Sequence, residues 1–232
     1  KGNVLRVWEI NKSMEKAKGL KGVILDFGGV ISRTLFETHA LTEVALGLPK
    51  KSLKWLGPFD ISSDSLWQSM QSDKISERDY WHERTKEVAD LIGANWDQMS
   101  DFVKAARGSE PLEIIRPEAI IAIEHWKSNN VKLAVLSNEL DLFYGDKFRD
   151  KLPFLDFFDI IHDATYTKML KPDPRSYISC LNDLNLQPQD CLFIDDQLRN
   201  VIGAQKIGLN TIHFNVLNPK ESFSQALELS KF

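Results

Sequence analysis

The chain has few cysteines, no long apolar run and no excess of basic residues, and each shortage excludes a class of protein. Two cysteines among 232 residues are too few for the disulfide framework of a small secreted domain. Charged residues interrupt every apolar stretch before it reaches the roughly 20 residues of a membrane-spanning helix. A formal net charge of −4 gives no basic footprint for nucleic acid or an anionic membrane. We therefore expect a cytoplasmic protein with no nucleic-acid or membrane partner.

What the chain does contain is an alternation of strand-like and helix-like segments, in a composition that is 43% hydrophobic and 27% charged, as in ordinary globular proteins. Short apolar runs predict strands at 22–26, 131–137, 158–162, 191–195 and 211–214. Helical patterns lie between them at 117–128, 140–151, 174–184 and 198–207. This order is typical of an α/β fold, with a Rossmann-like parallel sheet covered by helices on both faces.

One region breaks this rhythm. Residues 33–110 contain almost no strand-like run and are dominated by helical patterns at 37–46, 76–91 and 96–106. Four of the six tryptophans fall there, and we expect them to pack a small helical core rather than to line a pocket. The predicted organisation is thus an N-terminal extension at 1–20, a core formed by 21–32 and 111–232, and an inserted helical domain at 33–110.

Polar residues that directly follow the predicted strands are the candidates for a site, because ligands of open parallel sheets bind beyond the carboxyl ends of the strands. Asp26 ends the first run and precedes Gly28 and Gly29, which permit close approach of the backbone to a ligand. Ser137 and Asn138 follow the second run and offer a hydroxyl and an amide to an anion.

Two more candidates come later in the chain. Lys171 lies in a proline-rich turn that opens a helix, and Asp195 and Asp196 follow the fourth run. Adjacent carboxylates repel each other unless a cation joins them, and oxygen ligands of this kind suit Mg²⁺. Each feature alone is more often a turn, a helix cap or a solvated loop. Their occurrence together and in this order argues against accident, and they indicate a site for Mg²⁺ and the oxygens of an anion.

The order Asp26, Ser137, Lys171, Asp195-Asp196 resembles the four sequence motifs of the haloacid dehalogenase superfamily, over nearly the whole chain. The helical insert between the first two motifs is similar to the cap domain of its first subclass. Within the superfamily the likeness is to the branch that contains α-glucose-1-phosphatases and the N-terminal phosphatase domain of soluble epoxide hydrolases.

The resemblance implies a role for each matching residue. Asp26 would attack phosphorus and form an aspartyl-phosphate. Mg²⁺ would be held by Asp26, the backbone carbonyl of Gly28 and Asp196, with support from Asp195. The substrate implied is a small phosphorylated metabolite, such as a sugar phosphate.

The phosphoryl oxygens would be held by two side chains from other motifs. The resemblance assigns this role to Ser137 and Lys171, and Lys171 would also offset the charge of Asp26. Asn138 and Asn200 would support the site. Asn138 is also a candidate substrate-binding residue.

Gly28 departs from the pattern, because most phosphatases of this superfamily carry a second Asp two residues after the nucleophile. That acid is worth about 10²- to 10⁴-fold in rate, so its loss predicts a slower enzyme. Three hypotheses follow. The first is a magnesium-dependent phosphatase, the second is a non-catalytic or regulatory phosphate-binding protein, and the third is a metal-independent 2-haloacid dehalogenase, which does not need the second Asp.

Overall fold

The computed structural model describes residues 19–107, 111–138 and 140–230. The predicted N-terminal extension lies outside the described residues except for its last two. The chain divides into two compact units. The first, called here the core unit, comprises Lys1–Ser32, Arg116–Asn138 and Phe154–Phe232. The second, called the helical unit, comprises Arg33–Ile115 and Glu139–Pro153. The boundaries given above for a core and a cap stay predictions.

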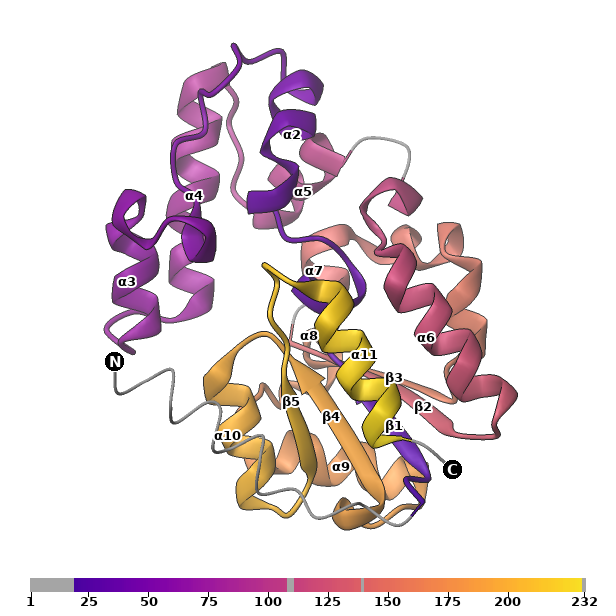
Figure 1. Cartoon of the computed structure of the whole chain (residues 1–232). Coiled ribbons are helices and arrows are strands. Elements are labelled where there is room, and N and C mark those ends of the chain that lie inside the picture. The colour runs from indigo at the N-terminus through magenta and orange to yellow at the C-terminus, as the bar shows by residue number, and fades with distance from the viewer. Residues whose placement is uncertain (1–18, 108–110, 139, 231–232) are drawn as a thin grey trace. The chain divides into compact units, whose positions relative to one another are not determined.

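The core unit is built on a sheet of five parallel strands in the order β3-β2-β1-β4-β5 (Figure 1). Its first two strands along the chain, and the fourth, are almost completely buried, as expected when helices cover both faces. The fold is therefore the predicted Rossmann-like α/β sheet. The strands are β1 (Gly22–Leu25), β2 (Lys132–Ser137), β3 (Ile160–Asp163), β4 (Cys191–Asp195) and β5 (Asn210–His213).

Two pairs of helices pack on the sheet. Helices α9 (Pro174–Leu184) and α10 (Leu198–Lys206) contact each other and the strands, and α6 (Pro117–Ser128) contacts α11 (Pro219–Leu229). Ile24 and Phe193 cluster with Leu181 of α9, so the alternate strand residues face the other layer. A buried hydrogen bond of 2.7 Å from Trp126 Nε1 to Ser230 Oγ ties α6 to the C-terminal end of α11. The core unit also contains the short helix α8 (Ala164–Thr167).

The helical unit is organised around aromatic side chains. Phe36 lies edge-on to Trp55 and Trp67, with ring centroids 5.6 and 5.1 Å apart. Trp81 belongs to the same buried cluster, and the partly buried Trp96 packs against it. The four tryptophans therefore pack in the core of this unit, as predicted. The helices are α2 (His39–Ala45), α3 (Ser65–Gln71), α4 (Glu77–Ile92), α5 (Met99–Arg107) and α7 (Leu140–Tyr144).

Local signals explain where the helices of this unit begin and end. Ser76 and Asp79 form a reciprocal capping box at the start of α4, and Gly93 ends that helix in the left-handed conformation with φ of 67°. The Asp64 carboxylate accepts a hydrogen bond from the backbone amide of Trp67 and caps α3. These caps satisfy backbone donors that would otherwise have no partner.

The segment 140–151 differs from its prediction as one continuous helix. Helix α7 ends at Tyr144, Gly145 adopts φ of 82°, and the chain continues as a 3-10 turn over Asp146–Lys151. A left-handed residue cannot continue a right-handed helix, so Gly145 is the physical reason for the break. The segment groups with the helical unit by its contacts.

Both cysteines are buried free thiols of the core unit. Burial raises the pKa of Cys180 and of Cys191 to about 12, which keeps both protonated and unreactive at neutral pH. They pack as small apolar side chains, as the sequence predicts. Among the helices described, none is long and apolar enough to span a membrane.

Candidate active site

Two carboxylates are brought together by the register of neighbouring strands. Leu25 at the end of β1 is level with Ile194 in β4, so Asp26 and Asp195 come next to each other at the carboxyl edge of the sheet. The amide of Asp26 donates to the Ile194 carbonyl at 2.9 Å and extends this pairing by one residue. The sequence prediction that Asp26 and Asp195 share one edge is realised by this register.

Lys171 bridges these two carboxylates. Its ammonium lies 2.8 Å from Asp26 Oδ1 and 2.7 Å from Asp195 Oδ2. The Lys171 side chain is 2% exposed and that of Asp195 is fully buried, whereas the Asp26 side chain is 13% exposed. Of the two carboxylates that Lys171 holds, Asp26 is therefore the one that a solute can reach.

The charge on Lys171 is maintained by these partners. Burial by itself lowers the pKa of the Lys171 ammonium, but the carboxylates of Asp195 and Asp26 outweigh it and raise the pKa above its ordinary value. Lys171 is thus a permanent cation at neutral pH. A permanent cation next to Asp26 can neutralise charge on an anionic ligand that approaches this carboxylate.

Asp195 is held in one orientation by its other hydrogen bonds. Its Oδ1 accepts from the backbone amide of Gln197 at 2.8 Å, and the side-chain amide of Asn200 donates to both carboxylate oxygens at 3.1 Å. These donors satisfy the buried carboxylate oxygens and restrict their orientation. Asn200 therefore supports the site by fixing Asp195, which in turn fixes Lys171.

The backbone of Lys171 is held by Asn138. The Lys171 amide donates to Asn138 Oδ1 at 2.7 Å, and Asn138 Nδ2 donates back to the Lys171 carbonyl at 3.1 Å. Two residues further on, Asp173 caps α9 by accepting from the amide of Arg175. The Asn138 amide thus positions Lys171, a contact that the sequence did not predict. Its predicted contact with substrate stays a prediction.

Ser137 is the last residue of β2, the strand next to β1. Its register partner in β3 is Asp163, and the residue is 7% exposed. The hydroxyl is thus near the same edge of the sheet as Asp26, as the sequence placed it. Its role as a phosphate ligand stays a prediction.

Of the two glycines after Asp26, only Gly29 is required by the structure, a distinction that the sequence did not predict. Gly29 has φ of 82°, and a Cβ atom there would lie 2.7 Å from Asp196 Oδ2. The Gly29 carbonyl accepts from Arg116 Nε and Nη2, at 3.2 and 3.1 Å. Gly29 therefore lets the Asp196 carboxylate approach the loop. The buried Arg116, 87 positions later in the chain, fixes the loop by its hydrogen bonds to the Gly29 carbonyl.

Gly28 has no such requirement. Its φ of −71° and ψ of 125° are open to any residue, and a Cβ atom would meet nothing within 4 Å. The residue is exposed. Neither the backbone conformation nor the surrounding space therefore requires a glycine at this position.

Asp196 completes a cluster of three carboxylates. One oxygen from each of Asp26, Asp195 and Asp196 lies within 4.8 Å of the others. The backbone oxygen of Asp196 accepts from His213 Nε2 at 3.0 Å, and Gln197 Nε2 donates to its carboxylate at 3.3 Å. Oxygen donors in this number, beside the Lys171 ammonium, fit a hard divalent cation.

Known proteins similar to this chain include phosphatases and dehalogenases. The chain is 25% identical to the sesquiterpene phosphatase astK of Aspergillus oryzae over 211 residues, which cover 90% of the chain and 94% of that protein. It is 37% identical over 93 residues to mouse acyl-CoA dehydrogenase family member 10, covering 39% of the chain and only 8% of that much longer protein.

The fold has solved relatives as well. The structure of L-2-haloacid dehalogenase from Xanthobacter autotrophicus superposes with a TM-score of 0.54 at 19% identity, over 83% of this chain and 76% of the dehalogenase. At that identity the likeness concerns the fold alone. The family model of haloacid dehalogenase-like hydrolases matches residues 20–208, which include every candidate site residue. The chain therefore belongs to the haloacid dehalogenase-like hydrolase family.

Proposed function

We propose that this hydrolase is a magnesium-dependent phosphatase of a small phosphorylated metabolite, with Asp26 as the nucleophile. The observation that carries the proposal is the bridge of Lys171 between the accessible Asp26 and the buried Asp195, with Asp196 in the same carboxylate cluster. The near full-length similarity to a sesquiterpene phosphatase supports the same reaction type.

The proposed reaction proceeds in two displacements at phosphorus. A carboxylate oxygen of Asp26 attacks phosphorus, the bond to the ester oxygen breaks, and the leaving alkoxide takes a proton from water. Water then attacks the aspartyl-phosphate, loses a proton to solvent, and phosphate departs as the Asp26 carboxylate is regenerated. In this proposal Lys171 and Ser137 hold the phosphoryl oxygens, and Asn138 supports them.

The carboxylate cluster would hold Mg²⁺ through Asp26, Asp196 and the Gly28 carbonyl, with Asp195 in support. A divalent cation there supplies positive charge that reduces the repulsion between Asp26 and an anionic phosphate. The carboxylate cluster argues against the dehalogenase hypothesis, because a metal-independent enzyme has no divalent cation to offset the repulsion among three carboxylates. The fold likeness to a dehalogenase does not separate the two reactions.

Removal of the nucleophile tests the proposal. Phosphate release from a panel of small phosphate esters should fall by about 10³-fold or more in Asp26→Asn, and chelation of divalent metal should abolish it. Asp183→Asn is the matched control, because Asp183 lies in the same unit with a 59% exposed side chain that contacts only His162 among the partners described. Equal activity of Asp26→Asn and Asp183→Asn would refute the role of Asp26.

The alternative of a non-catalytic phosphate-binding protein is favoured by Gly28, where most phosphatases of the family carry an acid. The backbone and the open space at Gly28 accept a side chain, so Gly28→Asp should fold normally and restore proton transfer to the leaving group. We expect an increase of about 10-fold or more in phosphate release for a slow phosphatase. If the wild-type chain and the Gly28→Asp variant both bind phosphate and neither releases it from any ester, the binding protein is favoured.

A further inference from the structure

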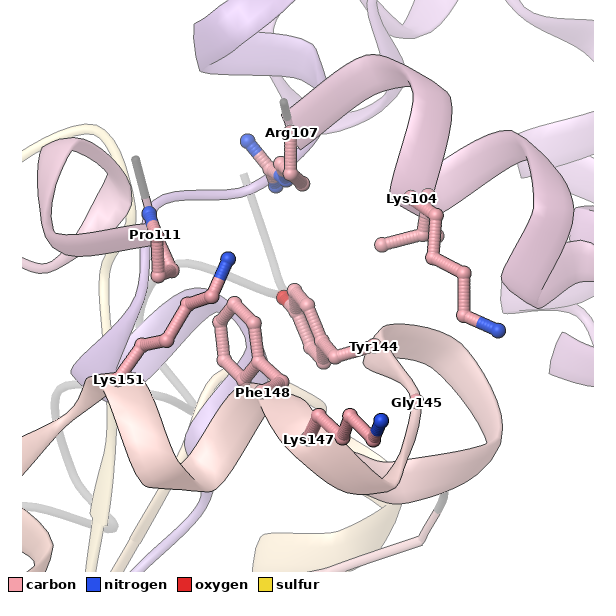
Figure 2. Close-up of a pocket in the computed structure, with 9 residues that line it drawn as sticks. Lys104, Arg107, Pro111, Tyr144, Gly145, Lys147, Phe148 and Lys151 are labelled. Carbon is pink, nitrogen blue, oxygen red and sulfur yellow. The ribbon is translucent and has the colours of Figure 1, made fainter. Parts of the chain in front are cut away.

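The helical unit contains a pocket of about 270 Å³ that shares no residue with the carboxylate cluster. Helix α5 forms one wall, and the end of α7 with the turn after Gly145 forms the other (Figure 2). Four of its nine lining residues are cationic and none of the nine is acidic. The cationic residues are Lys104, Arg107, Lys147 and Lys151. Positive charge is thus concentrated at one recess of a chain whose net charge is −4.

Arg107 is fixed in place at this pocket. Its Nη1 donates to Thr38 Oγ1 at 2.6 Å, and its Nη2 donates to the Arg33 carbonyl at 3.2 Å. Its Nε is buried and has no hydrogen-bond partner among the residues that the structure describes. A guanidinium already ordered by the protein loses little further freedom when it binds an anion.

Lys104 is positioned by the glycine of the opposite wall. Gly145 has φ of 82°, and a Cβ atom there would lie 2.7 Å from Lys104 Cε. The Lys104 stem therefore packs across the turn in space that only glycine leaves open. The same glycine that ends α7 thus places a cation from α5 beside the pocket.

An aromatic pair lies between two of the cations in the view of Figure 2. The rings of Tyr144 and Phe148 are stacked, with centroids 4.3 Å apart and an interplanar angle of 22°. In the view of Figure 2, Lys151 and Lys104 lie on opposite sides of this pair. This arrangement matches a compact ligand with more than one anionic group better than it matches a single ion.

We propose that this pocket binds a small polyanion that carries phosphoryl groups, such as a diphosphate. A fixed guanidinium together with lysine ammonium groups is a set of donors suited to phosphoryl oxygens. The volume is slightly below that of typical pockets for drug-sized ligands, about 300–1,000 Å³, so the ligand is compact. This binding requires neither a metal nor Asp26, and it is therefore independent of the proposed phosphatase activity.

Residue-resolved lysine reactivity tests this inference, with inorganic pyrophosphate as the probe. The full chain in a chelating buffer is acetylated with and without pyrophosphate at constant ionic strength, and each lysine is quantified by mass spectrometry. Lys104 and Lys147 should react at least about threefold more slowly at saturation, as expected for a site that is mostly occupied. Lys86 is the internal control, because it lies on α4 of the same unit with a 53% exposed side chain.

A substitution keeps the inference testable without disturbing the fold. Lys147→Gln removes an exposed cation and should raise the pyrophosphate concentration that half-protects Lys104 by about 10-fold, whereas Lys86→Gln should leave it unchanged. Orthophosphate should protect Lys104 more weakly than pyrophosphate. Equal protection of Lys104 and Lys86, equal protection by the two anions, or no protection at all would each overturn the inference. None of these outcomes depends on hydrolysis at Asp26.

Discussion

The two units differ in how many of their buried side-chain polar atoms lack a hydrogen-bond partner among the residues described: the helical unit has six and the core unit has two. In the core unit, the buried Lys171 and Asp195 are joined to each other and to further donors. In the helical unit, both ring nitrogens of His39, the indole nitrogen of Trp55 and the hydroxyl of Thr42 are buried with no hydrogen-bond partner among the residues described. His39 and Trp55 are adjacent, with ring centroids 4.4 Å apart.

The two units are therefore stabilised mainly by different kinds of interaction. Charge pairs with fixed hydrogen bonds impose one geometry on the core unit at its carboxyl edge, as a site for chemistry requires. The helical unit has a buried aromatic cluster beside the hydrogen-bonded Asp64, and several of its buried polar atoms have no hydrogen-bond partner among the residues described. Changes of charge should therefore act most strongly on the core unit and changes of pH on the helical unit.

The largest effect on stability is expected from Lys171→Met. This substitution leaves Asp26 and Asp195 buried side by side without their cation, and breaking a buried ion pair from one side costs about 3–5 kcal/mol. The free energy of unfolding, measured by urea denaturation with chelator present, should fall by that amount. The control is Lys127→Met, which removes an exposed pair with Asp159 at 3.4 Å and should cost at most about 1 kcal/mol. Equal losses in the two variants would contradict the comparison.

A smaller effect should come from the protonation of His39 in the helical unit. Burial lowers the pKa of His39 from 6.5 to about 4, so the folded chain keeps it neutral while the unfolded chain binds a proton. The free energy of unfolding should therefore fall as the pH drops from about 6.5 to about 4, by roughly 3 kcal/mol, with no further loss from this residue below that range.

His39→Leu isolates that contribution, because it keeps an apolar side chain of similar size and cannot be protonated. After a constant offset is subtracted, the wild-type and variant curves of unfolding free energy against pH should coincide near pH 7 and separate toward pH 4, because only the wild type loses stability as His39 is protonated on unfolding. Parallel curves over this range would mean that His39 does not titrate as its burial implies.

The sheet and most of the site followed from the sequence because their signals are local. β4, α6 and α9 have the predicted bounds, since apolar runs and an N-terminal proline mark them directly. Asp26, Lys171, Asp195 and Asp196 converge because parallel strands end at the same edge.

The remaining features depend on contacts that no local pattern encodes. Arg116 reaches Gly29 across 87 positions, and Tyr80 and Arg84 reach Asp64 across 16 and 20. Helix α3 was not predicted, because it is too short to show an amphipathic pattern, although Asp64 is a favourable N-cap residue. The end of α7 at Gly145 was not predicted either, because one glycine within a helical pattern does not by itself indicate a left-handed conformation.

The two glycines after Asp26 allow a comparison within the core unit. Gly29→Ala places a methyl group 2.7 Å from Asp196 Oδ2 at a φ of 82°, and should cost about 2 kcal/mol of unfolding free energy. Gly28→Ala meets open space at an ordinary φ and should change stability by less than about 0.5 kcal/mol. Thermal denaturation of the two variants and the wild type measures both values. A greater loss in Gly28→Ala would reverse our interpretation of this loop.

The smallest effect compares one buried hydrogen bond from each unit. The Tyr80 hydroxyl donates to the Asp64 carboxylate at 2.7 Å in the helical unit, and the Trp126 indole donates to the Ser230 hydroxyl at 2.7 Å in the core unit. Hydrogen bonds to charged groups contribute more than neutral ones, so Tyr80→Phe should lose about 1 kcal/mol more than Ser230→Ala. Asp64 retains its bonds from Arg84 and the Trp67 amide in the first variant, which limits its loss. If Ser230→Ala loses more unfolding free energy than Tyr80→Phe, the neutral bond at the end of α11 contributes more than the bond to the charged Asp64. Aromatic packing, rather than the Asp64 network, would then account for the stability of the helical unit.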